Sequence, residues 1–401
     1  MKVIRVSRNT YEYFLLYTIA ILVIILSGSV PVSLANGVAL TRILSFTLIF
    51  ISAIYIVRAL INKRWVRSFV LSVLVLGMYW LINYIRYSES GFNLLIRFAW
   101  FITLFIMCKY VKFRGLDFEK CLYHIILILS MIAFAFFIII NFVDLSLPYT
   151  TVNNEGFIYY NYFGCFYVSP TYYVRFLGIL IYRMQSIFWE PGVFAVILNF
   201  AIYYFVFIDK KKKKLQLFVL LFDLLFTAST TGICVGICLV AVYFYRSRII
   251  KSLRLIISLP VVLIAFRIVY VVWTAKKAAT SYHMGSYFLR ANDIIVGLKL
   301  FASHFLIGVG YRNTKAFELA QGLGRGSSNG LITWFYTMGI VGVVLVMYPF
   351  IKNILLTKKI KDKIELGIFF LLFLILNMTE PIYSAPIMVY YVAREYTKSF
   401  Y

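Results

Sequence analysis

Long apolar segments with almost no charge alternate along the whole chain with short clusters of lysine and arginine. A helix of about twenty apolar residues crosses the hydrocarbon core of a bilayer. Because 63% of the residues are hydrophobic, against about 45–50% in soluble domains, a water-soluble core could not bury them all. The sequence therefore predicts an all-α, polytopic membrane protein with about twelve transmembrane helices. The predicted spans cover approximately residues 11–28, 38–57, 68–85, 92–108, 121–143, 187–208, 215–229, 231–245, 255–273, 329–351, 364–379 and 382–393.

The basic clusters indicate which ends of the spans face the cytoplasm. The chain carries 40 Lys and Arg against 15 Asp and Glu, a formal net charge of +25. Such an excess is also typical of nucleic-acid-binding proteins, but here it flanks apolar segments, as the positive-inside rule describes. We therefore expect cytoplasmic termini and no nucleic acid as a partner. The expected cytoplasmic segments are the N-terminus, 58–67, 109–120, 209–214, 246–254, 352–363 and the C-terminus.

The stretch 215–245 lies between two basic clusters, so it must cross the membrane an even number of times. Two short helices with a break at Ser229-Thr-Thr-Gly232 satisfy this condition. Asp223 lies in the first of them. We expect it to pair with an arginine or a polar neighbour rather than to carry protons.

Two external segments are long, at about 144–186 and 274–328. Long connections in compact proteins are usually functional. We expect one membrane domain over residues 1–401, with its active chemistry in these two loops. The cysteines and histidines are too scattered for a metal site, so neither a metal nor a cofactor is expected.

Three arginines interrupt apolar sequence, namely Arg42, Arg97 and Arg267. A charge at the bilayer centre costs at least about 2.5–3.5 kcal/mol. The predicted topology places all three in the outer third of their helices. They either extend to the outer headgroups or form a ring that binds an anionic group such as a pyrophosphate, which suits guanidinium.

The end of the first external segment combines Arg175, Arg183 and Glu190-Pro191. The two arginines are eight residues apart, near two helical turns, and could share a helical face. Proline and glutamate both favour a helix N-terminus, so Glu190 could simply begin the next span. Alternatively, its carboxylate orients an arginine or a sugar hydroxyl, or serves as a general base.

The second external segment contains Arg290, Asp293, His304 and Arg312. The pattern over 287–305 predicts an amphipathic helix lying on the membrane, with Ile295, Leu298 and Phe301 among its apolar residues. His304 is either a general base or polar surface.

Small and polar residues follow this predicted helix. Gly308-Val-Gly310 is a turn signal. Asn329 precedes a span and is typical of a helix cap. Gly339 and Gly342 allow close helix packing.

Several of these segments resemble the superfamily of O-antigen polymerases and ligases. Arg183-Met-Gln-Ser-Ile-Phe-Trp-Glu190-Pro191 resembles the Arg…Phe-x-Glu-Pro signature of Wzy-type O-antigen polymerases. Thr227-Ala-Ser-Thr-Thr-Gly232 resembles the break between two short helices of the wider superfamily. Arg290 through Gly310, then Ser328-Asn329-Gly330 and Gly339-Ile-Val-Gly342, resemble its second large periplasmic loop and the following span.

The resemblance implies a metal-independent glycosyltransferase of the bacterial inner membrane with a periplasmic active site. Such an enzyme transfers a growing glycan from undecaprenyl pyrophosphate to the sugar of an incoming lipid-linked unit. Arginines of the external loops would hold the pyrophosphate. The expected partners are the undecaprenyl-pyrophosphate-linked oligosaccharide, membrane lipid and a chain-length regulator protein.

Candidate residues follow from this implied reaction. Glu190, Arg183, Arg290 and His304 are candidates for catalysis. Candidates for pyrophosphate or substrate binding are Arg175, Arg312, Arg42, Arg97, Arg267 and Asn329. Ligases of the superfamily carry His-Asn where this chain has Ser328-Asn329, which favours a polymerase and leaves the general base open between Glu190 and His304. A ligase, or a flippase of lipid-linked sugars, is the alternative.

Overall fold

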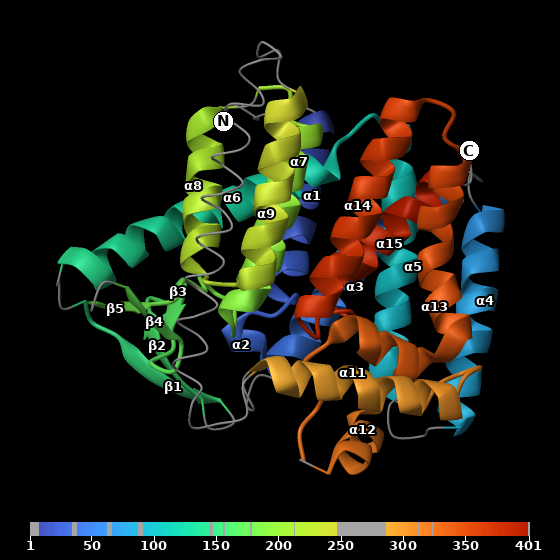
Figure 1. Ribbon diagram of the computed structural model, residues 1–401. Helices are drawn as coiled ribbons and strands as arrows, with labels where there is room; N and C mark the ends of the chain where they lie inside the picture. Colours follow the sequence, from blue (N-terminus) through green and yellow to red (C-terminus); the bar gives the residue numbers. More distant parts are fainter. Residues whose placement is uncertain are drawn as a thin grey trace. The chain divides into compact units, whose positions relative to one another are not determined.

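The computed structural model describes residues 8–33, 38–61, 66–86, 91–143, 147–154, 157–176, 179–211, 213–246, 286–311, 313–322 and 324–399. The fold is all-α, as predicted, with two small sheets besides the helices (Figure 1). The predicted span 255–273, with Arg267, and the candidate Arg312 lie outside the described residues. The chain forms two compact units. The first comprises Met1–Ser27, Ala39–Cys121 and Tyr287–Tyr401, and the second comprises Gly28–Val38 and Leu122–Ser286.

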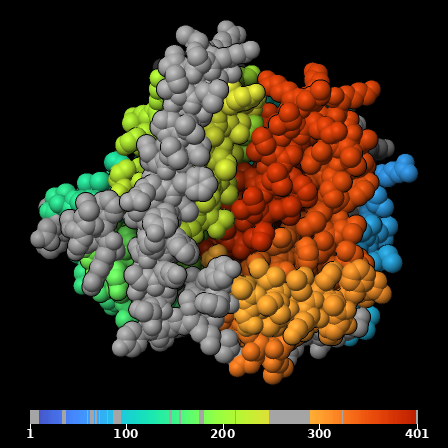
Figure 2. All heavy atoms as spheres, in the orientation of Figure 1, coloured from blue at the N-terminus to red at the C-terminus, as the bar shows by residue number. Residues whose placement is uncertain are grey.

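The first unit is a helical bundle. Within it α5 packs on α4 and α15, and α13 packs on α14 and α15. The shorter α11 and α12 lie crosswise at one end of these helices (Figure 1), and Figure 2 shows their side chains exposed on that face. Its helices are α1 (Arg8–Ile25), α3 (Val38–Ile61), α4 (Val66–Arg86), α5 (Gly91–Phe113), the start of α6 (Phe118–Ile138), α11 (Ser286–Ser303), α12 (Thr314–Gln321), α13 (Gly330–Leu356), α14 (Ile360–Thr379) and α15 (Pro386–Ser399).

Buried ion pairs fix helices of this unit to one another. Arg394 of α15 pairs with Glu119 of α6 and with Glu395, both at 2.6 Å. Glu12 of α1 pairs with Arg58 of α3 at 2.7 Å. A buried charge is tolerated when it is paired and hydrogen-bonded. These four helices therefore carry polar contacts that apolar packing alone would not specify.

Helix α13 is broken at Gly339, whose backbone angles are φ 60° and ψ −172°. The segment 305–310, which follows α11, fills the break. A Cβ on Gly308 would lie 2.5 Å from the Thr337 carbonyl, so the two backbones touch. Four backbone hydrogen bonds of 2.8–3.2 Å join Val309 to Tyr336, Gly310 to Thr337, Ile340 to Phe305 and Val341 to Leu306. The backbone groups freed by the break are thereby satisfied, as an apolar environment requires.

The predicted amphipathic helix is present as α11, but its faces differ from the prediction. Phe301 packs against the buried cluster around Phe317 and Tyr336. Ile295 and Leu298 are instead exposed. The 3.6-residue period identified the helix but not which apolar residues meet α13, because the close approach at Gly297, against Ile332, sets its rotation.

The second unit contains three adjacent helices and two small sheets (Figure 1). Its helices are α2 (Val30–Ser33), most of α6 with its continuation η3 (Ile139–Val143), α7 (Pro191–Phe207), α8 (Lys214–Phe226) and α9 (Thr230–Arg246). Helices α7, α8 and α9 pack on one another. The predicted break between two short helices is confirmed, but it lies slightly earlier than Ser229–Gly232: α8 ends at Phe226 and α9 begins at Thr230.

The segment between α6 and α7 forms strands, which the sequence did not predict. The antiparallel strands β1 (Thr150–Asn154), β2 (Phe157–Tyr162) and β3 (Phe166–Val168) form one sheet, and β4 (Tyr173–Phe176) and β5 (Ile179–Tyr182) form a hairpin. Arg175 pairs with Leu180 in that hairpin. The expectation that Arg175 and Arg183 share a helical face is therefore wrong. The segment between α6 and α7 is rich in tyrosine and other residues of high β propensity, which explains why it forms strands.

Three of the described helical segments are long and apolar enough to cross a membrane: Val38–Arg58, Phe118–Val143 and Gly330–Leu356. Helices also occupy the other predicted spans that the structure describes. The number of crossings, about twelve, and the external position of the two loops stay predictions.

Candidate functional site

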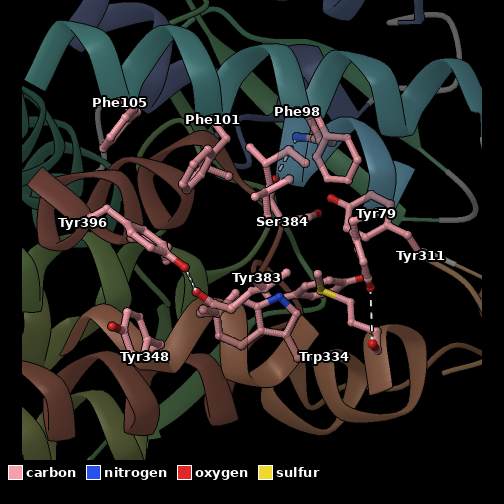
Figure 3. Close-up of a pocket in the computed structure, with 18 of the residues that line it drawn as sticks. Tyr79, Phe98, Phe101, Phe105, Tyr311, Trp334, Tyr348, Tyr383, Ser384 and Tyr396 are labelled. Atoms are coloured by element: carbon pink, nitrogen blue, oxygen red, sulfur yellow. Dashed lines mark hydrogen bonds between the residues drawn. The ribbon is translucent and has the colours of Figure 1, made fainter. Parts of the chain in front are cut away.

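A cavity of about 320 Å³ lies within the first unit, between α4, α5, α13 and α15 (Figure 3). We call it the groove. Apolar and aromatic side chains form most of its walls, including Phe98 and Phe101 of α5 and Trp334 of α13. Pockets that bind small molecules are typically apolar with a few placed polar groups, and the groove has this composition.

The polar groups gather at one end of the groove. There Arg97 of α5 donates a hydrogen bond to the Ser384 carbonyl at 2.9 Å and lies 4.1 Å from the Trp100 ring centroid. Tyr383 and Tyr311 meet edge to face, with centroids 6.3 Å apart. The candidate Arg97 is therefore held by α5 and by the short segment between α14 and α15.

A buried carboxylate, Glu380, begins that same segment. It is 4% exposed, and its Oε1 lies 3.9 Å from Nη2 of Arg290, the candidate on α11. Sequence reasoning missed Glu380. The sequence feature that could have identified it is the pair Glu380-Pro381 at the end of an apolar run, which repeats the pair Glu190-Pro191.

Close backbone contact joins the start of α13 to the 380–384 segment. A Cβ on Gly330 would lie 2.4 Å from the Glu380 carbonyl oxygen, so only glycine fits there. Asn329 is buried and caps α13, accepting a hydrogen bond from the Ile332 amide at 3.0 Å. Its capping role is confirmed, while its role in substrate binding stays a prediction.

Asp293 of α11 organises the preceding loop. It is fully buried and pairs with Arg325 at 2.8 Å. Its oxygens also accept hydrogen bonds from Gln321 at 2.8 Å and from the Ser328 hydroxyl at 2.7 Å. The sequence indicated no role for Asp293. It fixes the approach to Asn329.

In the second unit, Arg183 connects two of the segments on which the resemblance rests. Its Nε–H donates to the Thr227 carbonyl at 2.8 Å, at the break between α8 and α9. The neighbouring Met184 amide donates to the Phe226 carbonyl at 2.9 Å. The side chain of Arg183 also lies over the Tyr172 ring, 5.8 Å from its centroid. Arg183 thus holds the β5–α7 connection against the helical break.

Glu190 occupies the N-cap position of α7, with Pro191 as the first helical residue. Within the described part of the chain its side chain makes no capping hydrogen bond, so the cap is backbone geometry alone. The Tyr159 hydroxyl donates to the adjacent Trp189 carbonyl at 3.0 Å. Burial, together with the nearby charge of Glu190, raises the pKa of Tyr159 to about 12, which keeps this hydroxyl a donor at neutral pH.

Asp223 of α8 has the polar neighbour that we expected. Asp223 is fully buried, and its Oδ2 accepts a hydrogen bond from Ser130 of α6. Close packing surrounds it, since a Cβ on Gly236 would lie 2.3 Å from the side chain of the adjacent Leu224. We read this aspartate as part of the packing of the second unit.

The remaining candidates occupy varied positions. His304 is exposed at the end of α11, with Nδ1 3.0 Å from the Ser303 hydroxyl. Arg42 lies in α3 and is exposed. Arg175 lies in β4, but its side chain is not among those described. The structure therefore brings Arg290, Asn329 and Arg97 near one short segment of the first unit, and it places Arg183 and Glu190 in the second.

No protein-family model matches this chain, and no curated protein matches it at a significant level.

Proposed function

We propose that the chain is an integral-membrane glycosyltransferase of the bacterial inner membrane that polymerises undecaprenyl-pyrophosphate-linked repeat units at the periplasmic face. The proposal draws on the sequence resemblance and on the chemistry of the first unit. It includes about twelve spans and both termini in the cytoplasm. The product would be an O-antigen or a related surface polysaccharide.

One observation carries the proposal. A buried carboxylate, Glu380, lies beside Arg290, and four residues further on the same segment meets Arg97 at the end of the groove. A glycosyl transfer from a lipid pyrophosphate needs a base for the acceptor hydroxyl and cations for the leaving group. A carboxylate of this segment and cations of α11 and α5 thus lie next to a cavity suited to an apolar chain.

The proposed reaction is a single displacement. The acceptor hydroxyl oxygen forms a bond with the anomeric carbon of the donor glycan, and the bond from that carbon to the pyrophosphate oxygen breaks. Glu380 takes the hydroxyl proton, and the lipid pyrophosphate departs with the bonding electron pair. Arg290 and Arg97 stabilise the charge that develops on this leaving group. Arg183 and Glu190, which lie in the second unit, stay candidates for catalysis on the sequence resemblance.

The test is complementation of a deletion strain, with the surface glycan separated on a gel. Without the gene, lipid A core should carry one repeat unit and the ladder should disappear. Glu380→Gln should lower polymerisation by about 10²–10⁴-fold, the usual range for loss of a general base. Arg290→Ala should lower it by about 10²–10³-fold, as for loss of one charge-stabilising donor.

A matched control lies on α14, the helix that ends just before Glu380. Asp362→Asn removes an exposed carboxylate from the other end of α14 and should restore the full ladder. Membrane abundance of every variant must be equal. If Glu380→Gln also restores the ladder while Glu190→Ala does not, the base belongs to the second unit and our assignment is wrong.

A flippase of lipid-linked sugars is the second candidate, favoured by the broken helix α13. Transporters commonly place their sites at such interruptions. In this chain, however, the segment 305–310 already satisfies the backbone groups at the break. The same deletion strain separates the two functions, because loss of a flippase would leave no repeat unit on the surface at all.

A further inference from the structure

We infer that the groove holds the polyprenyl chain of the lipid carrier, with the carrier phosphate at the Arg97 end and the chain running toward Tyr348 and Tyr396. This inference rests on the proposed function and deepens it by assigning a binding site to the lipid part of the substrate. It concerns binding of the carrier alone, so it is tested separately from polymerisation.

The two ends of the groove differ in chemistry. At one end are the Arg97 guanidinium, the Ser384 carbonyl that it binds, and Tyr311. At the other end the Tyr396 hydroxyl donates to the Leu345 carbonyl, which leaves the ring toward Phe101, with centroids 5.7 Å apart. Figure 3 shows Tyr396 and Tyr348 at one side of the cavity and Tyr79 and Tyr311 at the other. A molecule with an anionic head and an apolar chain complements this gradient.

The walls of the groove do not seal it from the side. Helix α5 packs on α4 and on α15, α13 packs on α15, and the cavity lies between these four helices. Leu71 and Val75 of α4 line the cavity and are also 52% and 43% exposed. Exposed apolar side chains that continue into a cavity give a lipid chain a route from the bilayer. A water-soluble ligand would instead require a polar mouth.

The lining favours one methyl-branched chain over a phospholipid. A cavity of about 320 Å³ is at the low end of ligand pockets, which run from about 300 to 1,000 Å³, so it holds part of a single chain. Aromatic rings line both walls, with Phe98 and Phe101 on α5 and Trp334 on α13. Flat rings pack closely against the planar double bonds and methyl groups of isoprene units.

The hydrogen bond from the Tyr79 hydroxyl to the Met338 carbonyl, at 3.2 Å, links α4 to the residue before the α13 break. This contact lies at the same side of the cavity as Tyr311 (Figure 3). The carrier chain would therefore pass beneath a tyrosine that is anchored to the backbone of α13. The polyprenyl chain would therefore lie close to the break in α13, against which the second external segment packs.

The experiment measures photolabelling of the full purified chain in lipid nanodiscs by undecaprenyl phosphate bearing a diazirine. One probe, the tail probe, bears the diazirine at mid-chain or on the terminal isoprene. The other, the head probe, bears it on the first isoprene, next to the phosphate. We expect the head probe to label Tyr311 or the 383–384 segment. We expect the tail probe to label the groove near Val346, Tyr348 and Tyr396 rather than at the Arg97 end.

Two valines of α13 provide a matched pair. Val346 lines the groove, whereas Val344 lies two residues away and is 52% exposed. Val346→Trp fills the cavity and should weaken carrier binding by about tenfold or more. Val344→Trp adds the same bulk outside and should leave binding within about twofold.

Three outcomes would overturn the inference. Equal binding by both variants, or head labelling at Tyr396, would exclude the groove or its proposed direction. Equal competition by phosphatidylglycerol would show that the site takes ordinary anionic lipid. If instead the carrier binds as described but deletion of the gene leaves the glycan ladder intact, the lipid site stands and the proposed polymerase function fails.

Discussion

At the scale of single residues, the chemistry of the first unit depends on two buried carboxylates with different surroundings. Glu380 forms an ion pair with the partly exposed Arg290 at 3.9 Å. Asp293 accepts hydrogen bonds on both oxygens, from Arg325, Gln321 and Ser328, and so positions the loop that carries these residues.

We predict that Asp293→Asn destabilises the loop before Asn329 by about 1–3 kcal/mol. The substitution replaces an acceptor oxygen by an amide that faces donors, and it leaves the Arg325 charge without its carboxylate. Limited proteolysis near Arg325 and thermal unfolding in detergent would measure the effect. The same change at the exposed Asp362 is the control, and equal protease sensitivity of the two variants would contradict the positioning role.

At the scale of elements, the interrupted helix α13 is the feature that connects the segment after α11 to the groove. Its first half begins at the cap by Asn329 and carries Trp334 and Met338 into the groove. The break at Gly339 then accepts the segment that follows α11. An uninterrupted helix would leave that segment without hydrogen-bond partners and would displace α11.

Gly339→Ala should therefore destabilise the protein by about 2 kcal/mol or more, since a Cβ there would lie 2.5 Å from the Gly308 amide nitrogen in a backbone conformation that L-residues rarely adopt. Gly367→Ala in α14 is the control. No atom lies within 4 Å of its new Cβ, so helix propensity should make it neutral or stabilising by up to about 1 kcal/mol. Thermal unfolding followed by circular dichroism would compare the two variants. Similar melting temperatures would mean that the break is not required.

At the scale of the whole molecule, the outstanding question is how the chain lies in the membrane. Three described helical segments have the length and apolarity to cross it. The basic clusters predict that residues 352–363 are cytoplasmic and that residues 144–186 are external. The small sheets between α6 and α7 suit an external position, because their edges need water or a partner.

Cysteine labelling tests this topology in a variant whose five native cysteines are replaced by serine. A cysteine at the exposed Thr151 of β1 should react with a membrane-impermeant maleimide in intact spheroplasts. A cysteine at Lys359, before α14, should react only after permeabilisation. Labelling of Lys359→Cys in intact cells would reverse the predicted orientation and remove Arg290 and Glu380 from the periplasmic face.

The sequence by itself determined the helical class, the positions of the described helices and the break between α8 and α9. These follow from the lengths of apolar segments and from polar or glycine residues between them, which are local properties. Tertiary structure alone decided that Arg183 reaches Thr227, that Asp293 gathers the loop before α13, and that Glu380 meets Arg290. Each of these contacts joins residues that are tens of positions apart, so the periodicity of apolar residues along the sequence cannot predict them. The break at Gly339 is of the same kind, because a glycine in an apolar run permits either close packing or interruption, and only the segment packed against it selects between the two.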